Sequence, residues 1–344
     1  MAFVSRPSFI RLLALLFMVG VVCAPSSASL AGDGDLRYFR IATGTSAGTY
    51  FGVGSLIAGA ITNPPGSRPC ERGGSCGVPG LIAVAQATSG ALENLELLRA
   101  GAVEAALVQA NLAAWAFQGT GIYSAKPTFA DLRSIATLYT ETVHIVVRAD
   151  GPVWKIADLK GRRVSLGEKG SAFVIDAGMV LGGLGLSEKS FTPVYLRPGP
   201  SVDELVAGRI DAMFIVGGAP FSAVSDAAAR IPVRLLPIGP KEAAALHTRH
   251  PFFTETVIAA DVYRNVPETV TVGVGAQLVV RESLDAELVA GVTRALWHAS
   301  TRHALEQSFA KGGLAARPTA QTVFLPPLHP GAIQAYQSLD RPDQ

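Results

Sequence analysis

The stretch from residue 38 to residue 60, YFRIATGTSAGTYFGVGSLIAGA, decides the fold. Phe39 and Ile41 are apolar and lie two residues apart, as on one face of a strand, so residues 38–43 are predicted as a strand. Residues 44–48 are small and glycine-rich, which is typical of a tight turn. Residues 49–60 then form a predicted helix. A strand, a turn and a helix in this order are the building unit of an α/β fold.

The same unit recurs along the 344-residue chain. Further apolar strands are predicted at 81–87, 105–110, 143–148, 163–166, 211–216 and 233–238. Helical segments follow most of them, and residues 284–303 are predicted as one long amphipathic helix. Alternating strands and helices indicate α/β architecture throughout, with mainly parallel sheets.

An internal echo points to two lobes of like design. Residues 98–105, LRAGAVEA, and residues 205–212, LVAGRIDA, share the pattern L-x-A-G-x-[VI]-[ED]-A. The unit at 39–60 also resembles the unit at 163–181. The alternative is chance similarity between ordinary helix–strand connections. The length of the chain allows about two domains.

The N-terminus has the features of a secretory signal peptide. Arg6 and Arg11 precede an uncharged run over residues 12–24, and small residues follow it. Residues 1–31 are therefore predicted as a signal peptide, cleaved between Ala28 and Gly32. The alternative is a retained membrane anchor, but 13 apolar residues are short for a span of about 20.

The charge balance argues against polyanionic partners such as nucleic acid and anionic lipid. Arg6 and Arg11 are the charged residues of the predicted signal peptide, so 27 of the 29 basic residues remain against 27 acidic ones. A neutral mature chain offers no electrostatic footprint for nucleic acid or anionic lipid.

Cys70 and Cys76 remain after removal of Cys23 with the signal peptide. An even pair in an oxidising compartment predicts a surface disulfide between them. A metal site is disfavoured, because two thiolates with no histidine nearby in the sequence do not complete a zinc shell.

Four turns between a predicted strand and a predicted helix share small, hydroxyl or glycine residues. They lie at 45–48, 89–90, 170–172 and 217–219. Turns at the carboxyl ends of parallel strands are where ligands bind in such sheets. Helix N-termini favour anions there, so the turns predict a site for a carboxylate. The alternative for each single turn is an ordinary helix cap.

Two other motifs are typical of enzymes or metal sites, but each of them is incomplete in this sequence. Residues 44–48, GTSAG, match the G-x-S-x-G nucleophile elbow with Ser46 as nucleophile, but too few residues precede them to build an oxyanion hole. His247 and His250 have helical spacing but lack a third zinc ligand in a matching motif. Arg148 and Arg197 follow strand-like segments, and a surface or interlobe role is expected for both.

Five segments in order resemble the TAXI-type solute receptors of tripartite (TRAP) transporters, over essentially the whole mature chain. Residues 41–50, IATGTSAGTY, are close to the opening I-x-T-G-x-x-x-G-x-Y of that family, and residues 88–95 are similar to its T-x-G-S-x-x-N-L. Residues 107–111, LVQAN, are similar to L-V-Q-S-D. Residues 158–164 resemble D-L-K-G-K-R-V, and residues 211–220 resemble D-A-x-F followed by G-x-P.

The resemblance implies a two-lobed periplasmic binding protein, type II-like, whose lobes are joined by a hinge. Lobe I would comprise residues 32–142 plus 268–344, and lobe II residues 143–267. It implies a periplasmic receptor, not an enzyme, with no cofactor and no metal, and a monomer is expected. The ligand would be a glutamate-like amino acid, 2-oxoglutarate or another dicarboxylate, and the partner a fused integral-membrane TRAP permease.

The positions that match the family motifs supply the predicted ligand contacts. They are Thr45, Ser46, Tyr50, Ser89, Gln109, Asn111, Ser171, Ala172 and Gly218. Asn111 departs from the aspartate of the family motif, and the loss of that acid would favour a more anionic ligand. Two alternatives stay open: a binding protein of the same fold that feeds a signalling receptor, and a secreted serine hydrolase using Ser46.

Overall fold

The computed structural model describes residues 36–308, 313–318 and 325–340, so the predicted signal peptide and its cleavage site lie outside it. The strands are β1 (Arg37–Ala42), β2 (Thr62–Asn63), β3 (Val78–Pro79), β4 (Leu81–Gln86), β5 (Ala105–Gln109), β6 (Leu132–Arg148), β7 (Arg163–Ser165), β8 (Thr192–Val194), β9 (Ala212–Gly217), β10 (Val233–Leu235), β11 (Thr254–Ile258) and β12 (Thr269–Arg281). The helices are α1 (Thr49–Ile61), α2 (Ala91–Arg99), α3 (Ala110–Gln118), α4 (Ala172–Gly183), α5 (Pro198–Val206), α6 (Ser222–Arg230), α7 (Pro240–Arg249), α8 (Ala286–Trp297), α9 (Ala299–Glu306) and α10 (Pro330–Leu339). The predicted α/β class is confirmed. Over the described ranges, the helices are too short or too polar to cross a membrane.

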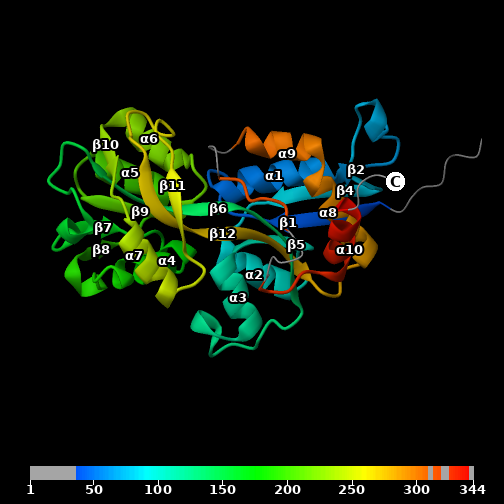
Figure 1. Cartoon of the computed structure of the whole chain (residues 1–344), viewed down its shortest axis with the longest axis horizontal. Coiled ribbons are helices and arrows are strands. Elements are labelled where there is room, and N and C mark those ends of the chain that lie inside the picture. Colours follow the sequence, from blue (N-terminus) through cyan, green and yellow to red (C-terminus); the bar gives the residue numbers. More distant parts are fainter. Residues whose placement is uncertain (1–35, 309–312, 319–324, 341–344) are drawn as a thin grey trace, which may run out of the picture. The chain divides into compact units, whose positions relative to one another are not determined.

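The strands join in a sheet of order β3-β2-β4-β1-β5-β12-β6-β9-β7-β8, with β10 paired to β6 and β11 to β12. The sheet is mixed rather than mainly parallel. β1 pairs in parallel with β4 and β5, and β7 with β8 and β9. Between these parallel groups run the long strands β6 and β12, which are antiparallel to each other and to their outer neighbours (Figure 1). A strand–helix–strand crossover brings the chain back in the same direction, which makes the neighbouring strands parallel. β6 and β12 run in the opposite direction to the strands beside them, so their pairs are antiparallel.

The strands β5 and β9 each separate two hydrophobic cores. In β5, Ala105 and Leu107 pack in one core with α1 and α8, whereas Ala106 and Val108 pack in another with α2 and α3. The alternation follows from the two-residue period of a strand. Accordingly, α1 and α9 lie on one face of this part of the sheet and α2 and α3 on the other (Figure 1).

β9 repeats this arrangement in the second half of the fold. Phe214 and Val216 pack in a core with α4 and α7, and Met213 and Ile215 in a core with α5 and α6. The first pair of cores draws its residues from 39–139 and 276–336, and the second pair from 143–274. The predicted lobe boundaries near 143 and 268 subdivide one compact unit, Asp35–Gln344, and remain a prediction.

The internal sequence echo has a structural counterpart. Gly101 and Gly208 follow α2 and α5 with φ angles of 71° and 69°, a conformation that glycine adopts without steric cost. The acid that follows each glycine accepts a backbone N–H from an arginine in the neighbouring parallel strand. Glu104 accepts from Arg40 at 2.6 Å, and Asp211 accepts from Arg163 at 2.8 Å. The two halves therefore share a local design in atomic detail.

The predicted long helix at 284–303 is wrong. It is two helices, α8 and α9, because His298 between them has extended backbone angles, φ −62° and ψ 143°. The His298 side chain accepts the backbone N–H of Ser300 and so caps α9. Helical periodicity continues across the break, which is why the pattern alone misses it.

The contact between α10 and α8 depends on a glycine. A Cβ at Gly331 would lie 2.1 Å from the backbone oxygen of Ala286. We expect Gly331→Ala to destabilise the protein by about 2 kcal/mol, because α10 would have to shift away from α8. Gly59, exposed in α1 with open space around it, is the control. Gly59→Ala should stabilise by about 0.5–1 kcal/mol. Urea unfolding measures both, and equal effects of the two substitutions would contradict the packing argument.

Candidate ligand-binding site

A cavity of about 110 Å³ lies where the carboxyl ends of several strands meet the beginnings of helices. From the first half of the fold it is lined by Gly44, Thr45, Gly48, Thr49, Tyr50, Ser89, Gly90, Ala91, Gln109, Tyr139 and Glu141. From the second half it is lined by Glu168, Ser171, Ala172, Phe173, Arg197, Pro198, Val216, Gly217 and Phe221.

Six of the nine predicted ligand contacts line this cavity: Thr45, Tyr50, Ser89, Gln109, Ser171 and Ala172. The other three do not. Ser46 is exposed in the turn before α1, and Gly218 is buried beside the lining residue Gly217. Asn111 is fully buried, and its Nδ2 donates to Asp176 Oδ1 at 3.1 Å. Asn111 does not line the cavity, and its link to the cavity runs through Asp176 to the lining residue Gln109.

Six helices, α1 to α6, begin at the cavity. Their N-cap residues all line it: Gly48, Gly90, Gln109, Ser171, Arg197 and Phe221. None of the six caps its helix with a side-chain hydrogen bond, whereas Asp285, His298 and His329 cap α8, α9 and α10 elsewhere. Of the six, α2 alone has an acidic residue in its first turn. Converging N-termini with few fixed negative charges favour an anion.

A buried polar network closes the inner end of the cavity. The Nε2 of Gln109 donates to Glu141 Oε2 at 3.1 Å and to Asp176 Oδ2 at 2.8 Å. Gln109, Glu141 and Asp176 are 1%, 3% and 0% exposed. The network therefore holds two carboxyl groups away from water, with one amide between them.

Both acids have raised pKa values. Burial first, and then the neighbouring Asp176, raise the pKa of Glu141 to about 8. Burial raises the pKa of Asp176 to about 7, against the hydrogen bonds from Gln109 and Asn111. At neutral pH the pair therefore retains protons, and the floor of the cavity is less negative than two carboxylates would make it. The phenols of Tyr50 and Tyr139 face Glu141, and burial raises their pKa values well above the usual range.

Sequence reasoning missed both acids. A signal existed for Asp176, which interrupts the apolar run AFVIDAGMV of α4 and so falls on a buried helix face. Glu141 lies within the long strand β6 and gave no comparable signal.

Arg197, expected at the surface or between lobes, lines the cavity while its guanidinium donates to Glu168 at 2.9 and 3.1 Å. Arg148 pairs with Asp150 instead.

The exposed position of Ser46 bears on the hydrolase alternative. Among the described residues, its hydroxyl makes no hydrogen bond to a histidine or a carboxylate. A nucleophilic serine needs a base within hydrogen-bonding reach. This arrangement gives Ser46 no such base.

The structure places the sulfur atoms of Cys70 and Cys76 at disulfide bonding distance, with Cα atoms 4.7 Å apart. The sequence argument against a metal relied on the absence of a nearby histidine, and here the fold corrects it. His298 lies beside the pair, and the three ligand atoms are within 4.8 Å of one another. In the oxidised state the sulfurs are bonded to each other and are not thiolate ligands.

Several proteins of known structure resemble this chain. The chain is similar to a TctC solute-binding protein from Polaromonas, with 19% identity and a TM-score of 0.48 over 81% of this chain and 90% of that chain. It is similar to the periplasmic aliphatic sulphonate-binding protein SsuA from Escherichia coli, with 16% identity and a TM-score of 0.43 over 88% and 91%. It is also similar to a histidine kinase sensor domain, with 13% identity and a TM-score of 0.46 over 81% and 99%. The model of the NMT1-like family matches residues 41–338, well over half of the sequence. The chain therefore belongs to the NMT1-like family.

Proposed function

We propose that this chain is a periplasmic solute-binding receptor that holds a small carboxylate in the cavity and delivers it to a membrane permease. The observation that carries the proposal is the convergence of six helix N-termini, none with a side-chain cap, on one cavity. The N-cap side chains leave the first backbone N–H groups of these helices without a hydrogen bond from the cap. A carboxylate oxygen in the cavity would accept hydrogen bonds from these N–H groups.

The inner network adds a second recognition element. Glu141 lines the cavity, and its protonated carboxyl group can donate a hydrogen bond, which a carboxylate accepts and a cation does not. Phe173 and Phe221 also line the cavity and suit the apolar stem of the ligand. Dicarboxylates, 2-oxoglutarate and glutamate-like amino acids fit this combination, and the TAXI-like motifs favour a TRAP permease as the partner.

The mechanism we propose is closure of two lobes, 32–142 plus 268–344 and 143–267, around the ligand. One contact supports this division: Ser222 Oγ donates to the backbone oxygen of Ala47 at 2.8 Å, across 175 residues of sequence. The two residues flank the beginnings of α6 and α1 at the cavity. Such a bond can form in a closed state and break when the ligand leaves.

A thermal-shift screen of the mature chain, residues 32–344, against mono- and dicarboxylates, amino acids and matched neutral amides tests the proposal. A ligand at 100 times its Kd should add about 2.7 kcal/mol of stability, which is a visible shift. We expect shifts with carboxylates and none with their amides. Native mass spectrometry of the same sample shows whether a ligand has been retained through purification. An empty protein that responds to no carboxylate would refute the proposal.

A further inference from the structure

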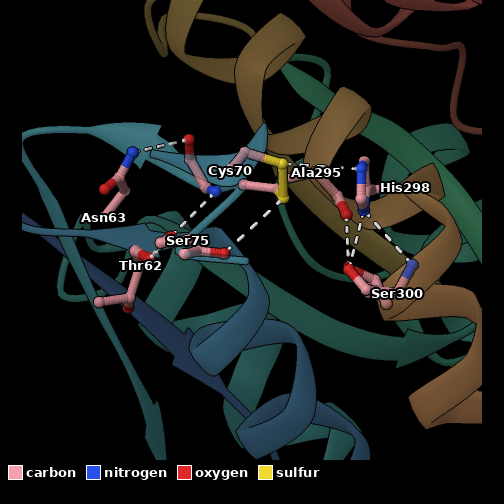
Figure 2. The surroundings of a disulfide bond; sticks show 11 residues. Thr62, Asn63, Cys70, Ser75, Ala295, His298 and Ser300 are labelled. Carbon is pink, nitrogen blue, oxygen red and sulfur yellow. Dashed lines mark hydrogen bonds between the residues drawn. A yellow bond between two sulfur atoms is a disulfide. The ribbon is translucent and has the colours of Figure 1, made fainter. Parts of the chain in front are cut away.

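The surface loop that carries the cysteine pair lies against the break between α8 and α9. Cys70 begins the short 3-10 helix Cys70–Arg72, and Cys76 lies just before β3. His298 is 228 residues further along than Cys70, yet its Nε2 is 3.8 Å from the Cys70 sulfur (Figure 2). Figure 2 shows the imidazole of His298 between the disulfide and Ser300. The fold therefore brings a histidine to one sulfur of the pair.

The other ring nitrogen of His298 fixes which atom carries the proton. Nδ1 accepts the backbone N–H of Ser300 at 3.3 Å and lies 2.8 Å from Ser300 Oγ. A nitrogen that accepts an N–H bond is unprotonated, so the proton of the neutral ring is on Nε2. His298 therefore presents an N–H donor to the Cys70 sulfur, not a free metal-ligating lone pair.

The two sulfurs have different surroundings. The Cys70 sulfur faces the Nε2–H of His298, whereas the Cys76 sulfur lies 3.9 Å from the backbone oxygen of Gly74. A hydrogen-bond donor stabilises a thiolate, and a carbonyl oxygen does not. Cys76 also lines two surface depressions, one beside Val78 and one beside Leu56, so a reagent can reach it.

We propose that the Cys70–Cys76 disulfide is a site of thiol–disulfide exchange in which a thiolate attacks Cys76 and His298 stabilises the departing Cys70 thiolate. In the first step an S–S bond forms between the external thiolate and Cys76. The Cys70–Cys76 bond breaks, and its electron pair stays on Cys70. A second thiolate of a dithiol reductant then displaces Cys76. The reductant is oxidised to a disulfide, and both cysteines are reduced.

Backbone hydrogen bonds hold the loop in addition to the disulfide, so we expect Cys70 to stay beside His298 after the S–S bond breaks. Gly74 N donates to Pro69 O at 3.0 Å, and Ser75 N donates to Arg68 O at 3.2 Å. Ser75 Oγ also donates to Thr62 O at 2.5 Å, which ties the loop to β2. Re-formation of the disulfide from this arrangement needs little rearrangement of the backbone.

The test uses the oxidised mature chain and reduced glutathione, a monothiol that traps the first step as a mixed disulfide. We expect peptide mass spectrometry to find glutathione on Cys76 and a free thiol on Cys70. His298→Ser should slow the reaction about tenfold, because serine keeps the helix cap but is too short to reach the sulfur. His303→Ser, in the next turn of α9, is the matched control and should leave the rate unchanged. Glutathione mainly on Cys70, or equal rates for the wild-type chain and His298→Ser, would overturn the proposal.

Discussion

Ala172→Asp is expected to weaken the binding of a small carboxylate by about 100-fold. Ala172 is the first residue of α4 and lines the cavity. A fixed carboxylate at this position would occupy the positive end of the helix that the ligand is proposed to use, and would repel the ligand at close range. Two like charges about 4 Å apart interact by up to about 4 kcal/mol at a protein surface, and partial screening leaves about 2–3 kcal/mol. Isothermal titration calorimetry with the ligand identified by the screen measures the loss.

Folding should not suffer from this substitution, because an aspartate in the first turn of a helix is favourable for the helix itself. The control is Ala172→Asn, which has nearly the same shape without the charge. We expect it to reduce affinity by less than about fivefold, since any steric effect is common to the two variants. If Asn and Asp reduce the affinity equally, the cavity is sensitive to volume and not to charge, and the anion proposal fails.

The stability of the ligand-free protein should fall by about 2 kcal/mol between pH 6.5 and pH 8. The folded-state pKa values of Glu141 and Asp176, about 8 and about 7, lie above the ordinary carboxyl range. The folded protein therefore holds protons that the unfolded chain has released, and this stabilisation is lost as the pH rises through the folded pKa values. Each unit of pKa shift corresponds to about 1.4 kcal/mol. Urea unfolding at the two pH values measures the difference.

The pH window is chosen to exclude an opposing group. Burial lowers the pKa of His144 to about 4, so His144 contributes stability that rises with pH from about 4 to its unfolded value near 6.5. Above pH 6.5 only about 0.4 kcal/mol of that contribution is still to be gained, which is small beside the expected loss. Glu141→Gln should remove most of the decrease, and Glu255→Gln, an exposed side chain on β11, should leave it unchanged. Equal stability of the wild-type chain at pH 6.5 and pH 8 would contradict the prediction, because the two buried acids would then not release their protons within this pH range.

The individual strands and helices could be predicted from the sequence, because the spacing of apolar residues differs between a strand and a helix with one buried face. The strand expected at 38–43 and the helix expected at 49–60 are β1 and α1 to within a residue. The length of β6 and the antiparallel course of β12 could not be predicted, since strand direction depends on distant partners. The helix break at His298 was equally hidden, because the apolar period runs through it.

In the candidate site, too, the local features could be predicted and the long-range contacts could not. Glycine and hydroxyl turns mark helix N-termini locally, so the residues at Thr45, Ser89 and Ser171 were within reach of a sequence argument. The bond from Gln109 to Asp176 joins residues 67 apart, and the contact of His298 with Cys70 joins residues 228 apart. No local pattern encodes which side chain arrives from so far away.

The strand order has a consequence for how this chain behaves at high concentration. The path from β3 to β8 ends on strands of two and three residues, and each contains a proline, Pro79 and Pro193. A proline has no N–H to offer to an incoming strand, and a short edge gives a second molecule little to pair with. At these two edges the sheet resists extension by another copy of the chain. The chain is thereby protected at these two edges from edge-to-edge aggregation with its own copies.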